Sequence, residues 1–167
     1  SGVQTSLPVA WLGNAANLGG FFFFARFALE ATSGTYRIFV GLSANNAALA
    51  ADPSTLANSV GISLDAADTT FQFLTRSATT ATKTNSTVTP STTTVYDFYM
   101  YALPNATAVN FELRNAATNA VLATSNNVTT NLPTNTTFMY MQCHISSATG
   151  TTSKVLSMNK MYLETNM

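Results

Sequence analysis

The chain has 167 residues, the length of one domain, and 46% of them are hydrophobic, which is enough for a full core and too many for intrinsic disorder. Only 8% are charged, and the seven basic residues balance the seven acidic ones. Nucleic acids and anionic membranes are bound by clustered cations, so the scattered Lys and Arg residues predict neither as a partner. No apolar run is long enough to insert into a membrane.

The first part of the chain predicts two strands and one long loop. Residues 1–18 form a polar lead-in, expected to be an oligomer contact or the connection to an absent shaft. Residues 21–29 predict a central strand, with the phenylalanines at 21–24 in the core. Residues 36–42 predict the next strand. The loop at 43–59 is rich in alanine but interrupted by Asp52-Pro53, so it predicts at most a short turn.

The rest of the chain adds strands but no helical periodicity. Residues 77–94 are nearly all Thr, Ser, Ala and Asn, which predicts a solvated edge strand and a loop. Turn-forming pairs such as Ser33-Gly34 and Thr149-Gly150 connect the strands. Apolar alternation predicts strands at residues 60–64, 70–76, 95–103, 110–114, 121–124, 137–145 and 154–165. About ten strands predict a single all-β domain over residues 1–167, an antiparallel β-sandwich of jelly-roll or concanavalin-like type.

Residue types for catalysis and metal binding are scarce. His144 is the one histidine, and on a strand its side chain points away from that of Cys143, which argues against nucleophilic catalysis. We expect Cys143 to be buried and His144 to lie at a surface or interface. No Cys/His cluster fits zinc and no acidic run has calcium-loop spacing, although a calcium site built from distant loops stays open. No enzyme activity, metal or cofactor is therefore predicted.

A charge-poor surface rich in Thr and Asn suits a neutral polar ligand such as a glycan, or packing in an assembly. Asn45 and Asn46, in the long loop, are candidate binding residues. Trp11 is another candidate, because it lies before the first clear strand. Its ring either closes the end of the core or is exposed at an interface or ligand site.

Asp97 is the most unusual carboxylate, because it lies on a strand among aromatic residues. We expect it to be tied to an arginine or to backbone amides, and a binding role is the alternative. Tyr99 and Tyr101 share its face of the strand. We expect both tyrosines to pack beneath the opposite sheet, with a place along a groove as the alternative.

The order of several short motifs is characteristic. They are Gly20-Phe21-Phe22-Phe23-Phe24, Asp52-Pro53, Tyr96-Asp97-Phe98, Leu103-Pro104-Asn105, Asn131-Leu132-Pro133 and Tyr162-Leu163-Glu164-Thr165. In this order, from residue 20 to residue 165, the chain resembles the C-terminal head domains of bacteriophage tail-fibre, appendage and related virion proteins. The resemblance implies a β-sandwich head on a trimeric fibre of the virion that attaches to the host surface. It implies no catalytic residues.

Two functions follow as expectations. The first is a homotrimeric fibre head that binds a host-surface glycan or protein, with the Asn45-Asn46 loop and residues 77–94 as the first places to look. The second is a purely structural role in a collar, head fibre or capsid decoration, in contact with other virion proteins. An enzyme such as a glycan depolymerase or esterase is disfavoured, because the residues that such chemistry needs are missing.

Overall fold

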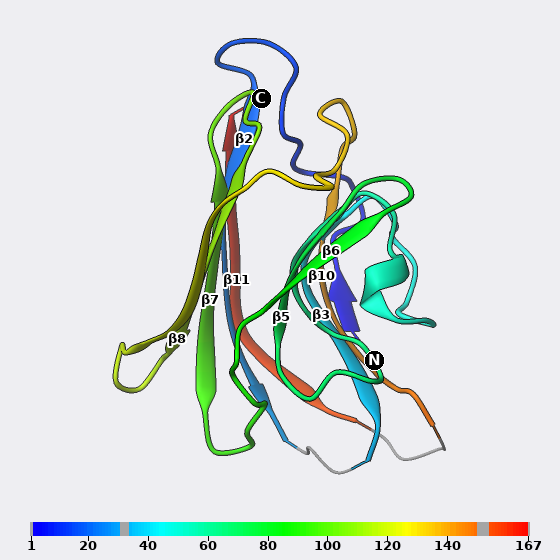
Figure 1. The fold of residues 1–167 in the computed structure, drawn as a ribbon, viewed down its shortest axis with the longest axis vertical. Coiled ribbons are helices and arrows are strands. Elements are labelled where there is room, and N and C mark those ends of the chain that lie inside the picture. Colours follow the sequence, from blue (N-terminus) through cyan, green and yellow to red (C-terminus); the bar gives the residue numbers. More distant parts are fainter. Residues whose placement is uncertain (1, 31–33, 150–153, 167) are drawn as a thin grey trace.

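Two antiparallel sheets packed face to face form the fold in the computed structural model, which describes residues 2–30, 34–149 and 154–166 (Figure 1). The six-stranded sheet has the order β1 (Gly2–Gln4), β10 (Tyr140–Ser147), β3 (Tyr36–Ser43), β4 (Ser59–Leu64), β5 (Gln72–Arg76) and β6 (Ala81–Asn85). The five-stranded sheet has the order β11 (Leu156–Asn166), β2 (Gly19–Leu29), β7 (Val95–Ala102), β8 (Val109–Asn115) and β9 (Val121–Val128). The predicted antiparallel β-sandwich is confirmed.

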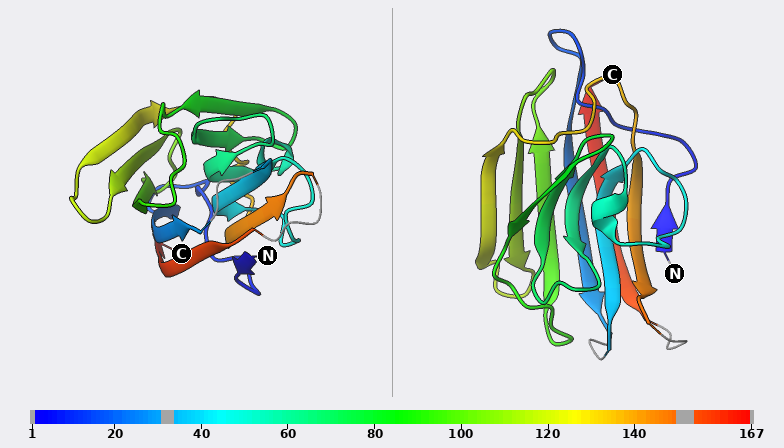
Figure 2. Two further views of the ribbon diagram at one scale, coloured as in Figure 1. Left: turned by 90° about the horizontal axis from the view of Figure 1, so that it is seen from below. Right: turned by 45° about the vertical axis from the view of Figure 1, so that its right-hand side comes forward.

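The main core lies between the two sheets, whose layers are seen end-on in Figure 2. Phe98 of β7 is fully buried, and its ring centroid lies 6.1 Å from that of Phe23, 6.4 Å from Phe73 and 6.4 Å from Phe111. These four rings come from four strands of both sheets, so they tie the layers together. Period-two alternation on each strand places them there.

The expectation that the phenylalanines at 21–24 all lie in the core is wrong for two of them. Phe21 and Phe23 are in the core, as predicted, but Phe22 and Phe24 point to the other side of the sheet. Phe22 is 39% exposed, and Phe24 is half-buried. The physical reason is the pleat: consecutive residues of a strand face opposite sides, so four consecutive phenylalanines cannot share one core.

The outer face of the six-stranded sheet is covered by the loop that follows β3. Phe39 and Leu74 project outward from this sheet and meet Leu49 and Leu56 of the loop in a second buried cluster. The predicted short turn in this loop is the 3-10 helix η1 (Pro53–Thr55). Arg37 Nε donates to Asp52 Oδ1 at 2.6 Å, which fastens the loop to β3. The loop therefore covers the outer face of the six-stranded sheet.

The N-terminal segment packs onto the sandwich. Strand β1, which the sequence did not predict, pairs with β10, and Ala10 and Leu12 are buried in the main core. A role of residues 1–18 as an oligomer contact stays a prediction. Strand β6 lies at the edge of the six-stranded sheet, as expected for the Thr-rich segment. The predicted turns at Ser33-Gly34 and Thr149-Gly150 each include a residue outside the described ranges.

Cys143 and His144 are consecutive residues of β10, so their side chains lie on opposite faces of the sheet. Cys143 is buried in the core, as expected, and burial raises the pKa of its thiol to about 12. The expectation of a surface or interface position for His144 is wrong, because the side chain is only 5% exposed. Strand β1 covers it: Gln4 Oε1 lies 3.1 Å from His144 Nε2, and a Cβ on Gly2 would come within 2.0 Å of Nδ1.

Among the described residues, no helix is long and apolar enough to cross a membrane.

Phe22 and Phe23 offer a matched test of the two sides of β2. Phe23→Ala is expected to lower the free energy of unfolding by about 3–5 kcal/mol, because it opens a cavity among packed rings. Phe22→Ala is expected to cost about 1 kcal/mol, because its ring is partly solvated already. Urea denaturation of both variants measures the difference. Equal losses would contradict the assignment of the two faces.

The burial of His144 predicts that the free energy of unfolding depends on pH. Burial lowers its pKa in the folded protein, whereas the unfolded chain binds a proton near the ordinary pKa of about 6.5. Acidification from about pH 7.5 to about pH 5.5 therefore favours the unfolded chain, and the free energy of unfolding falls. His144→Gln keeps a hydrogen-bonding side chain without the titration, so its urea midpoint should fall less over this range. The same decline in both proteins would argue against this origin.

Candidate functional site

The outer face of the five-stranded sheet is lined with aromatic side chains. The strand register aligns outward-facing residues of neighbouring strands in rows across the sheet. One row contains Tyr162, Phe24 and Tyr99, and the next contains Phe22 and Tyr101. These five side chains are referred to below as the aromatic face. Phe22, Tyr101 and Tyr162 are 39%, 45% and 44% exposed, so this face, unlike that of the other sheet, is open to solvent.

Four of the five rings of the aromatic face contact one another but are not coplanar. The Phe22 centroid lies 6.3 Å from that of Tyr99 and 6.3 Å from that of Tyr162, with interplanar angles of 48° and 61°. Phe24 and Tyr99 are 5.0 Å apart at 42°. Phe22 is therefore the centre of a cluster whose rings tilt from one strand to the next.

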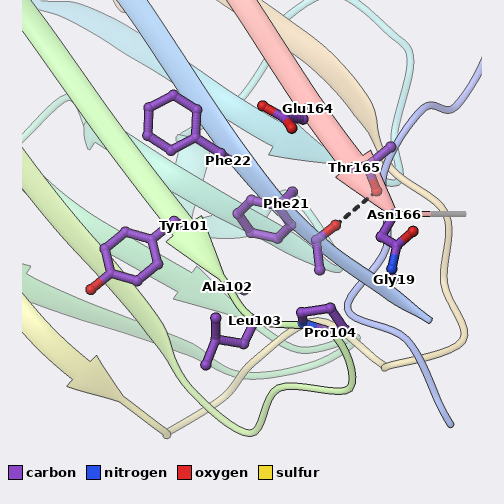
Figure 3. Close-up of a pocket in the computed structure, with 11 residues that line it drawn as sticks. Gly19, Phe21, Phe22, Tyr101, Ala102, Leu103, Pro104, Glu164, Thr165 and Asn166 are labelled. Carbon is purple, nitrogen blue, oxygen red and sulfur yellow. Dashed lines mark hydrogen bonds between the residues drawn. The ribbon is translucent and has the colours of Figure 1, made fainter. Parts of the chain in front are cut away.

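Three adjoining hollows meet at Phe22. Their volumes are about 420, 470 and 270 Å³, and Phe22 lines all of them. Figure 3 shows the first, which Glu164, Phe22 and Tyr101 line from three neighbouring strands. The second extends to Asn126 on β9, and the third to Lys160 and Tyr162 on β11. The hollows thus reach both edge strands of this sheet.

A charged row borders the aromatic rows. It contains Lys160, Arg26, Asp97 and Arg114, on β11, β2, β7 and β8. Arg26 donates to Asp97 twice, from Nε to Oδ1 at 2.6 Å and from Nη2 to Oδ2 at 2.7 Å. This fork geometry matches a carboxylate, and the hydrogen bonds raise the pKa of the Arg26 guanidinium. Both oxygens of Asp97 are therefore engaged within the sheet.

A second ion pair supports Tyr99. Arg114 Nε donates to Glu112 Oε1, and its Nη1 donates to Asn119 Oδ1 at 3.0 Å. The Arg114 Cζ atom lies 5.9 Å from the Tyr99 ring centroid, within the range of a cation–π contact. The bond to Glu112 raises the pKa of the Arg114 guanidinium. Arg114 is thus held in place from two sides and packs against Tyr99.

The sequence prediction for Asp97 is confirmed in one part, because the carboxylate is tied to an arginine. The preferred position for Tyr99 and Tyr101 is wrong: they lie on the outer face and line a hollow, not the space beneath the opposite sheet. Phe98 and Met100, the residues that alternate with them, fill the core instead. The alternation predicted two faces of β7 without telling which one is buried.

The other predicted residues line none of the three hollows. Asn45 and Asn46 are exposed in the loop over the six-stranded sheet, where their carbonyl oxygens accept from Gln142 and Gln4. Trp11 is half-buried, and its ring stacks on Phe138 at 4.9 Å and 15°. Its Nε1 is buried and has no hydrogen-bond partner among the described residues. The structure therefore does not bring Asn45, Asn46 or Trp11 together with Asp97.

Phe22, Phe24 and Tyr162 are the residues of the face that sequence reasoning missed. Tyr162 alternates with Met161 and Leu163 on β11, and this alternation was the available signal. Within residues 2–30, 34–149 and 154–166, no three His, Cys, Asp or Glu side chains lie together in a way that could hold a metal ion.

Comparison with known proteins shows the fold. No protein-family model and no curated protein matches the sequence. A peanut lectin in complex with a nonapeptide superposes with a TM-score of 0.62 and 11% identity, over 98% of this chain and 79% of the lectin. A protein of unknown function from Shewanella oneidensis MR-1 superposes with a TM-score of 0.58 and 14% identity, over 99% of this chain and 77% of that protein. At these identities the likeness extends to the β-sandwich fold alone.

Proposed function

We propose that the chain is the head domain of a virion appendage such as a tail fibre, and that its aromatic face binds a glycan on the host-cell surface. The observation that carries the proposal is the cluster around Phe22, at the meeting point of three hollows on an uncovered sheet face. Contiguous apolar surface left in solvent marks contact sites in soluble proteins.

The chemistry of this face fits a sugar. A sugar ring offers an apolar C–H face that packs on an aromatic ring, and its hydroxyls need donors and acceptors around the ring. Phe22, Tyr101 and Tyr162 offer the exposed rings. Glu164 and Asn126 border the hollows and offer a carboxylate and an amide. A few polar groups around an aromatic floor are typical of ligand sites.

The virion part of the proposal draws support from the motif order, which resembles tail-fibre head domains over residues 20–165. The shared fold with a lectin is compatible with sugar binding on such a scaffold. We further propose binding without catalysis. Asp97 and Glu112 are engaged by arginines, and Glu164 accepts from the Tyr162 hydroxyl at 3.2 Å, so the carboxylates of this face have local partners.

The first test is binding to an array of bacterial surface polysaccharides. Phe22→Ala and Tyr101→Ala are each expected to weaken binding at least about tenfold, because both remove a ring from the centre of the contact. Dissociation constants from biolayer interferometry on the polysaccharides that bind measure the loss.

Phe138→Ala is the matched control. Phe138 is 46% exposed, similar to Phe22, but its ring stacks on Trp11 and lines none of the three hollows. This variant should bind like the wild type. If Phe22→Ala binds unchanged while it remains folded, or if no polysaccharide binds, glycan attachment through this face is wrong.

The fibre part of the proposal predicts a homotrimer. A chain with formal net charge zero has little electrostatic repulsion against association. Multi-angle light scattering should give about three times the chain mass of 17.7 kDa. A monomer at all concentrations would contradict the fibre head and leave sugar binding to be judged by the array.

A further inference from the structure

The charges on the outer face of the five-stranded sheet cancel. Three cationic side chains, Arg26, Arg114 and Lys160, face outward together with three anionic ones. The anionic side chains are Asp97, Glu112 and Glu164. An acidic polysaccharide would gain little net attraction from such a surface, because the face carries as many carboxylates as cations.

Both arginines are also engaged. Carboxylates, sulfates and phosphates are recognised by guanidinium groups that can offer two parallel N–H donors. Arg26 already donates these two hydrogen bonds to Asp97, at 2.6 and 2.7 Å. Arg114 is held by Glu112 and Asn119 while it packs on Tyr99. The face therefore offers its aromatic rings and hydroxyl-binding groups rather than a free guanidinium.

The tilt of the rings restricts the shape of the ligand. The angles of 48°, 61° and 42° between neighbouring rings mean that one flat surface cannot lie on all of them. A flat crystalline polymer would meet a single ring. A single polysaccharide chain can rotate about each glycosidic bond and present successive sugar faces to successive rings.

We take the adjoining hollows, which share Phe22, as one interrupted groove across the sheet. It runs from Lys160 and Tyr162 on β11, past Phe22, to Asn126 on β9. Strands β11 and β9 are the two outer strands of this sheet, so the groove opens at both edges. Four strand spacings of about 4.8 Å give it a length of roughly 19 Å, longer than one sugar. A ligand can enter at one edge and leave at the other.

From these observations we infer that the ligand is an internal stretch of a neutral, linear polysaccharide, bound as a single chain across strands β11, β2, β7, β8 and β9. The inference rests on the proposed glycan binding and specifies the class of glycan. It distinguishes this site from one that caps a terminal sugar or pairs with an acidic one.

The test is competition in solution. Polysaccharides that the chain binds on the array are partially hydrolysed, separated into neutral and acidic pools by anion exchange, and sized by gel filtration. Each fraction then competes with the immobilised polysaccharide. Neutral fragments should inhibit, and the concentration for half inhibition should fall at least about tenfold from monosaccharide to hexasaccharide and then level off. Fragments with blocked ends should inhibit equally.

A charge variant gives an independent arm. Glu112→Gln removes the negative charge that neutralises Arg114 beside Tyr99, so this variant should gain binding to acidic polysaccharides, several-fold over wild type at low salt and reversed by 0.5 M NaCl. Asp52→Asn is the matched control. It changes the net charge equally and removes the charge that neutralises Arg37, but on the other sheet, and it should gain nothing.

The outcomes separate the two proposals. Suppose that Phe22→Ala loses binding. Inhibition by acidic fragments then overturns the neutral-chain inference and leaves glycan attachment standing. Inhibition by monosaccharides as strong as that by hexasaccharides does the same. An Asp52→Asn variant that gains as much as Glu112→Gln would likewise overturn the charge argument. Binding that does not depend on Phe22 overturns both. Length-dependent inhibition by neutral fragments alone supports the inference.

Discussion

Strand β2 carries four phenylalanines in a row, and its antiparallel pairing with β7 decides which of them meet the core. In the observed register Phe22 lies opposite Tyr101, and Arg26 lies opposite Asp97. A slip of one residue would turn every side chain of β2 to the other face, bring Arg26 into the core and expose Phe23. The two hydrogen bonds between Arg26 and Asp97 join residues that this register places directly opposite each other. This ion pair therefore favours the register on which both the core and the aromatic face depend.

One outer face of the sandwich is covered by a loop, and the other is exposed to solvent. Phe39 projects outward from the six-stranded sheet as Phe22 does from the other, but loop residues Leu49 and Leu56 bury it. The loop is long enough to cross its sheet and is anchored by the Arg37–Asp52 pair. Phe22 stays 39% exposed at the junction of three hollows. A fold that already covers one apolar outer face, yet leaves the other open, favours a contact function for the open one.

Most of the architecture could be predicted from the sequence, because a strand reveals itself in two-residue alternation. The Thr-rich edge, the short turn at Pro53 and the burial of Cys143 followed from local composition. The aromatic face could not be predicted in the same way. On β7, Tyr99 and Tyr101 alternate with Phe98 and Met100, so both faces are apolar, and only packing against the opposite sheet decides which is buried. The face combines residues from three segments that are distant in the sequence, Phe22, Tyr101 and Tyr162. Strand pairing brings them together.

The sequence has few charges, and their placement gives the low charge its physical meaning. Of seven basic and seven acidic residues, three of each lie on the outer face of the five-stranded sheet. Arg26 and Arg114 are bound to carboxylates there and hold β2, β7 and Tyr99 in position. Charges used in this way stiffen a surface without giving it a net field, because opposite charges in contact cancel at a distance. A stiff surface with tilted rings and no net charge suits a ligand matched by shape and hydroxyl pattern, such as the neutral polysaccharide that we propose.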